Sequence, residues 1–433
     1  MSFCNNELIN IYEELERGIN FIDNSDQAAK YTTSTNYSLE SETPFQRWYR
    51  YKEGFSYSLI KKLIEMQSKN TEGKILDPFL GSGTTCLVAD SLFRKCVGFE
   101  INPFSSFVSK CKLSYYSDDD KDELKRCINL MRNIRIYDYG ISNDPKLSFA
   151  KKVFDEDVRN IFLRIKTIIS SITKDEKVFN LCKLAWLSIL EDVSNYRKAG
   201  NGLKIKKTKK NSIKAEEIVS SYVNKLEIIY SDINKFSING LSQVINDSCL
   251  NIDLNEYGNY FDGIIFSPPY ANCFDYMEIY KLELWYGDFV KDYTELKQLR
   301  KQSFSSNLNS INGRIYDDEL FINLLNNMDD DLLWDKKIKL MLNDYFADFD
   351  ELLGKLNKVL NSGGFIDVVV GNSAYGGIVF PTDLFIAKIA KKYGFIVENI
   401  IIDRYLITSS QQYKKTLPFR KYLRESIVCL RKQ

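Results

Sequence analysis

The stretch Asp77-Pro-Phe-Leu-Gly81-Ser-Gly83-Thr-Thr85 decides the fold of this chain. A short apolar run, Lys74-Ile75-Leu76, leads directly into it, and a helical pattern of buried positions between Leu87 and Leu92 follows. A second apolar run, Cys96-Val-Gly-Phe99, then ends at Glu100. The order of strand, glycine-rich turn, helix, strand and acid predicts a βαβ unit of a parallel sheet.

A glycine-rich turn at the start of a helix suits a small nucleotide-like ligand, because the backbone approaches closely and unpaired amides point outward. The turn lacks the lysine of a phosphate-binding Walker loop and the third glycine of the dinucleotide fingerprint. Taken alone, it could be only a tight structural turn. Asp77 before it and Glu100 after it, where such folds hold ribose hydroxyls, favour a cofactor site.

A second unusual turn, Ser267-Pro-Pro-Tyr270, follows the apolar run Phe261–Phe266. Two prolines cannot continue a sheet ladder or donate hydrogen bonds, so they fix a rigid turn whose carbonyl groups are free to accept. The alternative is a plain turn that ends a strand. At the carboxyl end of a strand in the same sheet, however, this turn faces the crevice where such sheets bind ligands. A serine oxygen and a prolyl carbonyl there could accept both protons of an amino group.

Together, residues 77–85 and 267–270 resemble the cofactor motif and the catalytic motif of the DNA amino-methyltransferase family. The stretch from Arg47 to Ser56 resembles the family motif that precedes the first strand and borders the methionine end of the cofactor. The resemblance implies S-adenosylmethionine as the cofactor, with Glu100 at its ribose and Asp247 at its adenine. The implied cofactor-binding residues are Phe55, Ser56, Asp77, Phe79, Gly81, Ser82, Gly83, Thr84, Thr85, Glu100, Ile101 and Asp247.

The family mechanism assigns catalysis to Ser267, Pro268, Pro269 and Tyr270. It implies that the target base flips out of the duplex, that Ser267 and the Pro268 carbonyl hold its amino group, and that Tyr270 stacks on the base. Enzymes that methylate carbon 5 of cytosine carry a Pro-Cys nucleophile motif, and this sequence contains no Pro-Cys pair. Serine at the first motif position is commoner in members that act on cytosine N4, so cytosine is favoured and adenine N6 is the alternative.

Two functions from other classes stay open on sequence grounds. An RNA amino-methyltransferase would share the sheet and a related turn, although no RNA-binding module precedes the fold. A binding protein that keeps the cofactor fold without catalysis is disfavoured by the intact Ser267-to-Tyr270 turn. Failure of the protein to transfer a methyl group from bound cofactor would favour this binding-protein hypothesis again.

Composition narrows the chemistry further. The 433 residues contain no histidine and carry a net charge of +1. A Ser-His-Asp triad, histidine-bound zinc and histidine base catalysis are therefore excluded, and we expect no metal site. Nine cysteines without a CxxC pair indicate reduced core residues. No apolar run could span a bilayer and no signal peptide is evident, so we expect a cytoplasmic protein without a membrane partner.

The pattern along the chain predicts an α/β protein: a Rossmann-like class I methyltransferase sheet with a helical insertion and a smaller second insertion. We expect an N-terminal lead-in over residues 1–43, a helix followed by irregular chain, and a catalytic domain over 44–112 and 236–433. Residues 113–235 form the helical insertion, a candidate DNA-recognition region. The second insertion covers 287–346, and both insertions are expected to form walls of one cleft.

Contacts to double-stranded DNA are predicted from local basic patches, since the whole chain is nearly neutral. The segment 197–214 carries eight Lys or Arg and no acid, which indicates a flexible basic loop that tracks phosphates or else a solvated surface loop. The candidate DNA-binding residues are Arg197, Lys198, Lys204, Lys206, Lys207, Phe274 and Tyr276. The polar stretch 297–314 could read base edges or be a loop. A cognate restriction endonuclease is a further candidate partner.

Overall fold

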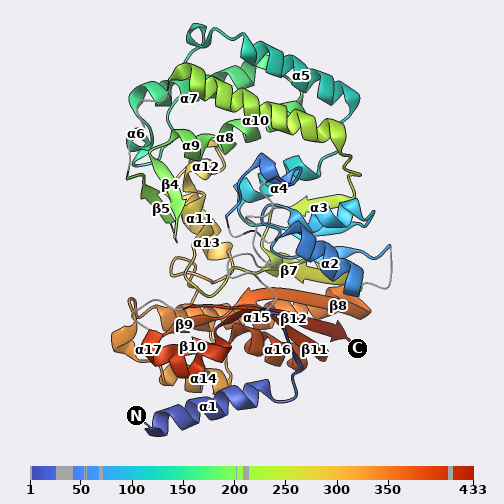
Figure 1. Ribbon diagram of the computed structural model, residues 1–433, viewed down its shortest axis with the longest axis vertical. Helices are drawn as coiled ribbons and strands as arrows, with labels where there is room; N and C mark the ends of the chain where they lie inside the picture. The colour runs from blue at the N-terminus through green and yellow to red at the C-terminus, as the bar shows by residue number, and fades with distance from the viewer. Residues whose placement is uncertain are drawn as a thin grey trace.

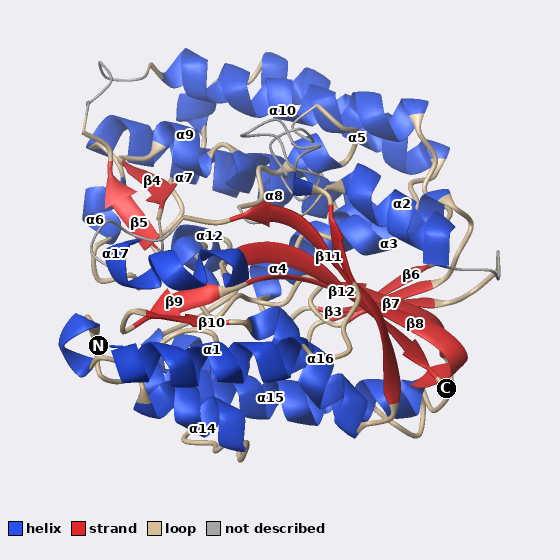
Figure 2. Ribbon diagram, turned by 60° about the horizontal axis from the view of Figure 1, so that its bottom comes forward, coloured by secondary structure: helices blue, strands red, loops and turns tan. Residues whose placement is uncertain are grey.

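A mixed eight-stranded sheet forms the centre of the molecule, in the strand order β1-β11-β12-β8-β7-β2-β3-β6 (Figure 2). The computed structural model describes residues 2–25, 42–52, 54, 56–67, 72–200, 202–207, 214–407 and 413–433. The strands of the sheet are β1 (Phe21–Asp23), β2 (Ile75–Asp77), β3 (Cys96–Phe99), β6 (Ser242–Ile245), β7 (Phe261–Phe266), β8 (Leu360–Gly371), β11 (Phe395–Tyr405) and β12 (Arg424–Lys432).

The strands from β6 to β8 are all parallel, and their chain order across the sheet is 3-2-1-4-5. This is the doubly wound order, in which the chain reverses direction across the sheet between β2 and β7. Strand β12 departs from it, because it lies antiparallel to both β8 and β11. The predicted α/β, Rossmann-like fold is confirmed, and the reversal point identifies the crevice where such sheets bind ligands.

Each face of the sheet has its own hydrophobic core, since successive side chains of a strand point to opposite faces. Ile75 and Ile265 lie in the core under the helices drawn above the sheet, whereas Leu76 and Ile264 lie in the core below it (Figure 1). The helices of the first core near the sheet are α2 (Tyr57–Gln67), α3 (Thr84–Ser91) and α4 (Pro103–Leu113). The second core contains α1 (Ser2–Glu16), α14 (Glu319–Asn326), α15 (Ile338–Val359) and α16 (Thr382–Lys392).

The N-terminal segment is part of this sheet, which corrects the prediction of a separate lead-in. β1 pairs parallel with Ile400–Ile402 of β11 and adds an edge strand. The Tyr12 hydroxyl of α1 donates to the Val379 carbonyl at 2.6 Å and anchors the helix to the C-terminal part of the chain. A strand of three residues has too little alternation to be recognised from its sequence.

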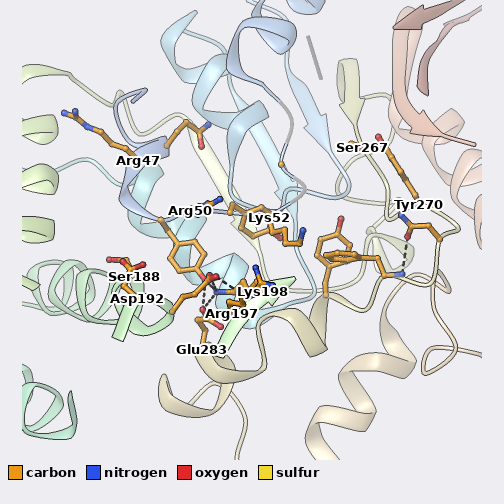
Figure 3. A pocket seen from close by; sticks show the side chains of 18 of the residues that line it. Arg47, Arg50, Lys52, Ser188, Asp192, Arg197, Lys198, Ser267, Tyr270 and Glu283 are labelled. Carbon is orange, nitrogen blue, oxygen red and sulfur yellow. Dashed lines mark hydrogen bonds and ion pairs between the residues drawn. The ribbon is translucent and has the colours of Figure 1, made fainter. Parts of the chain in front are cut away.

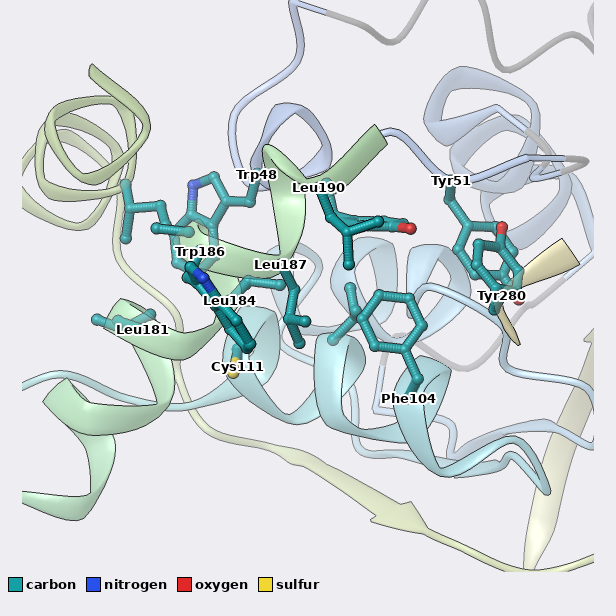
Figure 4. Close-up of a cluster of buried hydrophobic side chains, with 14 of the residues drawn as sticks. Trp48, Tyr51, Phe104, Cys111, Leu181, Leu184, Trp186, Leu187, Leu190 and Tyr280 are labelled. Carbon is teal, nitrogen blue, oxygen red and sulfur yellow. The ribbon is translucent and has the colours of Figure 1, made fainter. Parts of the chain in front are cut away.

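The helical insertion forms a separate layer above the sheet, at the top of Figure 1. Its long helices are α5 (Asp118–Arg132), α7 (Glu156–Ile172), α8 (Glu176–Ser188) and α10 (Ala215–Lys235), and its short ones are α6 (Ala150–Val153) and α9 (Leu190–Val193). Trp186 of α8 stacks on Phe162 of α7 at a centroid distance of 4.5 Å. Figure 4 shows Trp186, Trp48 and Phe104 in one cluster, so the core of the insertion is continuous with that of the sheet.

The basic segment after α9 begins with a hairpin, so the predicted flexible loop is wrong for this part. β4 (Tyr196–Ala199) pairs antiparallel with β5 (Gly202–Ile205), and Gly200 in the turn has a φ of +59°. Such a left-handed conformation favours glycine, which explains how the chain reverses within so few residues. Residues 208–213 of the predicted loop lie outside the described residues.

The second insertion is also structured and packs into the second core through Phe304 and Phe321. The polar stretch 297–314 was predicted to read base edges or to be a loop. Its Arg314 is not available to a base, because this side chain pairs with Asp348 and Glu351. The remaining elements are α11 (Tyr276–Ile279), α12 (Lys281–Tyr286), α13 (Tyr293–Gln302), α17 (Tyr413–Thr416), β9 (Ser373–Tyr375) and β10 (Ile378–Phe380). Short 3₁₀ turns lie at Gln46–Trp48, Ile136–Asp138, Cys249–Asn251, Asp330–Leu332 and Leu417–Tyr422.

One buried carboxylate joins the insertion to the segment before the sheet. Asp232 of α10 is 0% exposed and accepts from the Phe45 amide at 3.0 Å and from the Trp48 indole nitrogen at 2.9 Å. The Arg47 guanidinium pairs with it at 2.5 Å. Phe45 has a φ of +63°, a conformation that side chains rarely adopt, so its bond to Asp232 holds a strained turn.

We expect Asp232→Ala to lower the free energy of unfolding by about 2–4 kcal/mol, because it leaves a partly buried cation and two buried donors without their partner. Denaturant unfolding measures the change. Glu227→Ala on the same helix is the matched control, since its pair with Arg132 has side chains 40% and 53% exposed and is worth at most about 1 kcal/mol. Equal losses in the two variants would show that Asp232 is not a special anchor.

Candidate active site

The two sequence motifs lie side by side at the carboxyl ends of adjacent strands. β2 leads into the glycine-rich turn, and β7 leads into Ser267. The two strands pair through Ile75 with Gly263 and Leu76 with Ile264. Two hollows open at this edge. We name the first the narrow cleft; it is lined by Tyr51, Gly54, Pro78 to Ser82, Thr84, Phe99 to Asn102, Asp247 to Cys249, Ser267, Pro269, Asp275 to Met277, Ser303, Phe304, Ser306 and Asn307.

The glycine-rich turn has the backbone that its glycines permit. Gly81 and Gly83 have φ values of +55° and +89°, and both lie in the left-handed region. A Cβ atom on Gly83 would lie 3.1 Å from the Ser109 hydroxyl, so this glycine also allows close packing on α4. The turn therefore brings Gly81 and Ser82 to the wall of the narrow cleft and starts α3 at Thr84.

Glu100 closes the other side of the turn. Its carboxylate accepts from the Gly81 amide at 2.8 Å and from the Asn102 amide at 2.7 Å. Burial raises the pKa of Glu100 to about 8, although these two amides oppose the rise. A carboxylate oxygen can accept a second bond, so Glu100 can hold the turn and still accept from ligand hydroxyls.

The other predicted cofactor residues divide into those that line the narrow cleft and those that support it. Besides Glu100, the lining residues are Phe79, Gly81, Ser82, Thr84, Ile101 and Asp247. Asp77, Gly83 and Thr85 do not line it. Asp77 is fully buried and accepts from the Phe79 amide at 2.9 Å, and burial raises its pKa to about 7 against the effect of the Thr85 hydroxyl and this amide.

Ser56 and Phe55 are the remaining predicted cofactor-binding residues. The Ser56 hydroxyl accepts from the Leu59 amide at 3.1 Å at the start of α2, and Ser56 is not part of the lining of the narrow cleft. This corrects its predicted contact with the cofactor, because the hydroxyl satisfies the first turn of the helix instead. Phe55 lies outside the described residues.

The narrow cleft has donors that suit a nucleoside with polar substituents. Within the described chain, Ser82 Oγ and Asn102 Nδ2 are buried without a hydrogen-bond partner, and both residues line the cleft. Buried polar atoms normally have partners, so unpaired ones at a cleft indicate a ligand. With Glu100 and Asp247 as acceptors on the same wall, these residues fit the hydroxyl, amino and carboxylate groups of S-adenosylmethionine.

Sequence reasoning missed the part of this wall that comes from the second insertion. Phe304 packs edge-on against Phe79 at a centroid distance of 5.1 Å, and Asn307 is 5% exposed beside it. Asp275, from the segment after the catalytic turn, lines the same cleft. The chain places these residues far from the glycine-rich turn, and their local pattern carries no signal of the cleft.

We name the second hollow the wide pocket; its volume is about 960 Å³. It shares Tyr51, Gly54, Ser267 and Tyr276 with the narrow cleft, so the two hollows meet at Ser267 (Figure 3). The other lining residues are Gln46, Arg47, Tyr49, Arg50, Lys52, Ser188, Glu191, Asp192, Arg197, Lys198, Lys225, Tyr270, Asn272, Phe274, Glu283, Val369, Arg404 and Glu425.

The wide pocket carries an excess of positive charge, with seven basic and four acidic side chains in its lining. Its walls are the helical insertion, the segment before the sheet, the catalytic turn with the chain that follows it, and strands β8, β11 and β12. The prediction that both insertions form walls of one cleft is corrected here. The described lining includes the helical insertion, whereas residues 303–307 of the second insertion line the narrow cleft.

The turn from Ser267 to Tyr270 presents its residues to both hollows. Tyr270 lines the wide pocket and Pro269 the narrow cleft, whereas Pro268 is buried behind them. The Tyr270 hydroxyl donates to Glu425 at 2.7 Å, and burial raises its pKa well above the usual value. The predicted substrate-facing aromatics are close by: Phe274 and Tyr276 pack edge-on at 4.7 Å and both line the wide pocket.

The structure separates the predicted phosphate contacts into two groups. Arg197, Lys204 and Lys207 are exposed. Lys198 is different, because its side chain is only 6% exposed and its ammonium pairs with Glu191 at 3.3 Å and with Glu283. Lys206 donates to the Glu191, Asp192 and Ser194 carbonyls at the end of α9. Lys198 and Lys206 therefore hold the hairpin in place, which corrects their predicted contact with phosphates.

Two properties of the described residues concern membranes and metal ions. None of their helices combines the length and the apolar character that crossing a bilayer requires. No group of three acidic or cysteine side chains among them is placed to hold a metal ion.

The doubly wound sheet brings the glycine-rich turn, the acid after β3 and the turn at Ser267 to one edge, an arrangement that suits an α/β enzyme with a nucleoside site beside a second pocket. A family model described as DNA methylase matches residues 17–107. The Type II methyltransferase M.BsoBI of Geobacillus stearothermophilus is 28% identical over 414 residues, which cover 83% of this chain and 80% of that protein.

The Type II methyltransferase M.AvaI of Nostoc sp. is 25% identical over 411 residues, which cover 85% of this chain and 82% of that protein. Among solved structures, TrmN from Thermus thermophilus matches with a TM-score of 0.29 and 9% identity, over 87% of this chain and 49% of that one. The matched family model and these relatives support a DNA methyltransferase enzyme that depends on S-adenosylmethionine.

We expect Glu100→Ala to weaken binding of S-adenosylmethionine by about 1–3 kcal/mol, the usual effect of losing a hydrogen bond to a charged group. Isothermal calorimetry measures the dissociation constant. Glu123→Ala is the control, because this glutamate pairs with Arg126 on α5 and does not line the narrow cleft. Unchanged affinity in Glu100→Ala would remove Glu100 from the site.

The raised pKa of Glu100 predicts that cofactor affinity depends on pH. Ligand hydroxyls need the ionised carboxylate, which is the minor form below a pKa of about 8. Affinity should therefore rise roughly tenfold between about pH 7 and pH 9 and then level off. Calorimetry across this range should show a flatter profile for Glu100→Gln, and a flat profile for the wild-type protein would contradict the prediction.

Proposed function

We propose that the protein methylates the exocyclic amino group of a flipped DNA base, with cytosine N4 as the favoured target and adenine N6 as the alternative. The observation that carries the proposal is the position of Ser267. It lies on the wall that the narrow cleft and the wide pocket share. A base in the wide pocket can thus bring its amino group to the place where a cofactor in the narrow cleft ends.

The protein would contribute to this reaction mainly by positioning the two reactants. The bound cofactor supplies a methyl group that is already activated as a sulfonium. Ser267 Oγ and the Pro268 carbonyl accept the two amino protons and hold the nitrogen lone pair toward the narrow cleft. Formation of the carbon–nitrogen bond would be matched by cleavage of the carbon–sulfur bond, and the amino nitrogen would release one proton to water through the acceptors that hold it. Holding reactants in line lowers the barrier without a strong base, which suits a chain without histidine.

Duplex DNA is the proposed substrate because the wide pocket has a basic rim. Arg50 and Arg197 are exposed at this pocket, and cations placed there can neutralise backbone phosphates next to a flipped base. We assign recognition of the target sequence to the helical insertion, which supplies one wall of the wide pocket. A restriction endonuclease of the same system and a cytoplasmic location belong to the same proposal.

The experiment is methyl transfer from labelled cofactor to duplex DNA, followed by mass spectrometry of the nucleosides. We expect N4-methylcytosine, on the basis of serine at position 267. N6-methyladenine would overturn the choice of base but keep the mechanism. Label in RNA and not in DNA would overturn the proposed substrate.

The same assay tests the catalytic turn. Tyr270→Ala should abolish transfer and leave cofactor binding within about twofold, because Tyr270 lines the wide pocket and not the narrow cleft. Tyr293→Ala, which removes an exposed tyrosine on α13, is the control and should retain transfer. Loss of cofactor binding in Tyr270→Ala would show that the turn has only a structural role.

A further inference from the structure

Tyr270 reaches across one strand to contact the next. Its ring lies over Gly371 of β8, where an added Cβ atom would come within 2.8 Å of the ring. Its hydroxyl donates to Glu425 Oε1 on β12 at 2.7 Å, and Figure 3 shows Tyr270 and Ser267 on the same side of the pocket. Glycine at 371 therefore provides the space that lets the catalytic tyrosine reach a carboxylate on a strand beyond its neighbour.

Arg404 fixes the other oxygen of this carboxylate. Arg404 and Glu425 are paired positions of β11 and β12, and Arg404 Nε lies 2.6 Å from Glu425 Oε2. Glu425 is only 4% exposed, and both residues line the wide pocket. A carboxylate paired with an arginine offers acceptors alone, so the Tyr270 hydroxyl has to donate to it.

The direction of this hydrogen bond determines the next one. A phenol has one proton, so once Tyr270 donates to Glu425 its oxygen can only accept from another group. The Ser267 hydroxyl, three residues earlier in the same turn, also interacts with the phenol. Because the phenol proton is committed to Glu425, a hydrogen bond between the two hydroxyls has Ser267 as its donor, which leaves the lone pairs of Ser267 for a group at the boundary between the narrow cleft and the wide pocket.

We propose that Glu425, held by Arg404, is a positioning residue that makes Ser267 an acceptor toward the amino group of the substrate. The inference rests on the proposed function and adds a source of specificity to it. An acceptor at this point binds the N4 amino group of cytosine and repels the O4 oxygen that thymine places there. The arginine, the carboxylate, the phenol and the hydroxyl thus form one chain in which each donor is determined by the preceding group.

Glu425→Gln tests the direction of the chain. Arg404 can only donate, so it draws the glutamine oxygen toward itself and leaves the amide NH₂ facing Tyr270. Tyr270 then has to donate to Ser267, and Ser267 presents a proton to the substrate amino group. We expect the single-turnover rate of methyl transfer to fall on the order of 10- to 100-fold, with the cofactor dissociation constant and the thermal midpoint close to wild type.

A second substitution should restore activity. In Arg404→Ala/Glu425→Gln the arginine no longer orients the amide, so the glutamine can turn its oxygen to Tyr270 and recover the original direction. We expect the double variant to be about five- to tenfold faster than Glu425→Gln alone. If Glu425 served only to hold the strands together, removing its partner as well would lower activity further.

Glu398→Gln is the matched control, because Glu398 pairs with Arg431 between the same two strands at 3.0 Å and does not line either hollow. Its rate should stay within about twofold of wild type. A wild-type rate in Glu425→Gln, or a double variant slower than Glu425→Gln, would overturn the inference and leave the proposed function standing. Absence of methyl transfer by the wild-type protein to any DNA amino group would overturn both.

Discussion

The parallel pairing of β2 with both β3 and β7 is the constraint on which the site depends. Parallel neighbours end at the same edge of a sheet, so the loops that follow them must meet there. The glycine-rich turn, Glu100 and Ser267 follow these three strands, although Ser267 lies far along the chain from the other two. A slip of one residue in either of the two pairings would turn the alternating apolar side chains to the wrong face, and this cost keeps the edge in register.

The fold and the main motifs could be predicted because their signals are local. Gly81 and Gly83 sit where the backbone needs positive φ values, and the prolines after Ser267 sit where a strand must end. The same logic failed where the signal is too short or depends on a distant partner. Three residues of β1 carry no readable pattern, and the sequence after Ile189 shows its many lysines but not the hairpin into which some of them fold.

The location and partners of charged side chains are hard to predict from sequence alone. Lys198 and Arg197 are neighbours in one basic run, yet Arg197 is exposed and Lys198 is buried between Glu191 and Glu283. Their side chains point to opposite faces of β4, as successive residues of a strand must. Glu425 was likewise invisible as part of the site, because it contacts Tyr270 only through the antiparallel insertion of β12 beside β8.

The buried charges also explain how the wide pocket keeps its shape. A buried ion pair adds little net stability, since the cost of removing two charges from water offsets most of their attraction. Breaking such a pair is costly, however, so it fixes geometry more than it stabilises the fold. Lys198 ties the hairpin of the insertion to Glu283 behind the catalytic turn, and Asp232 ties α10 to the segment before the sheet. Polar contacts of this kind thus hold the helical insertion at a fixed position over the edge of the sheet, whereas a purely apolar interface would allow the two to slide.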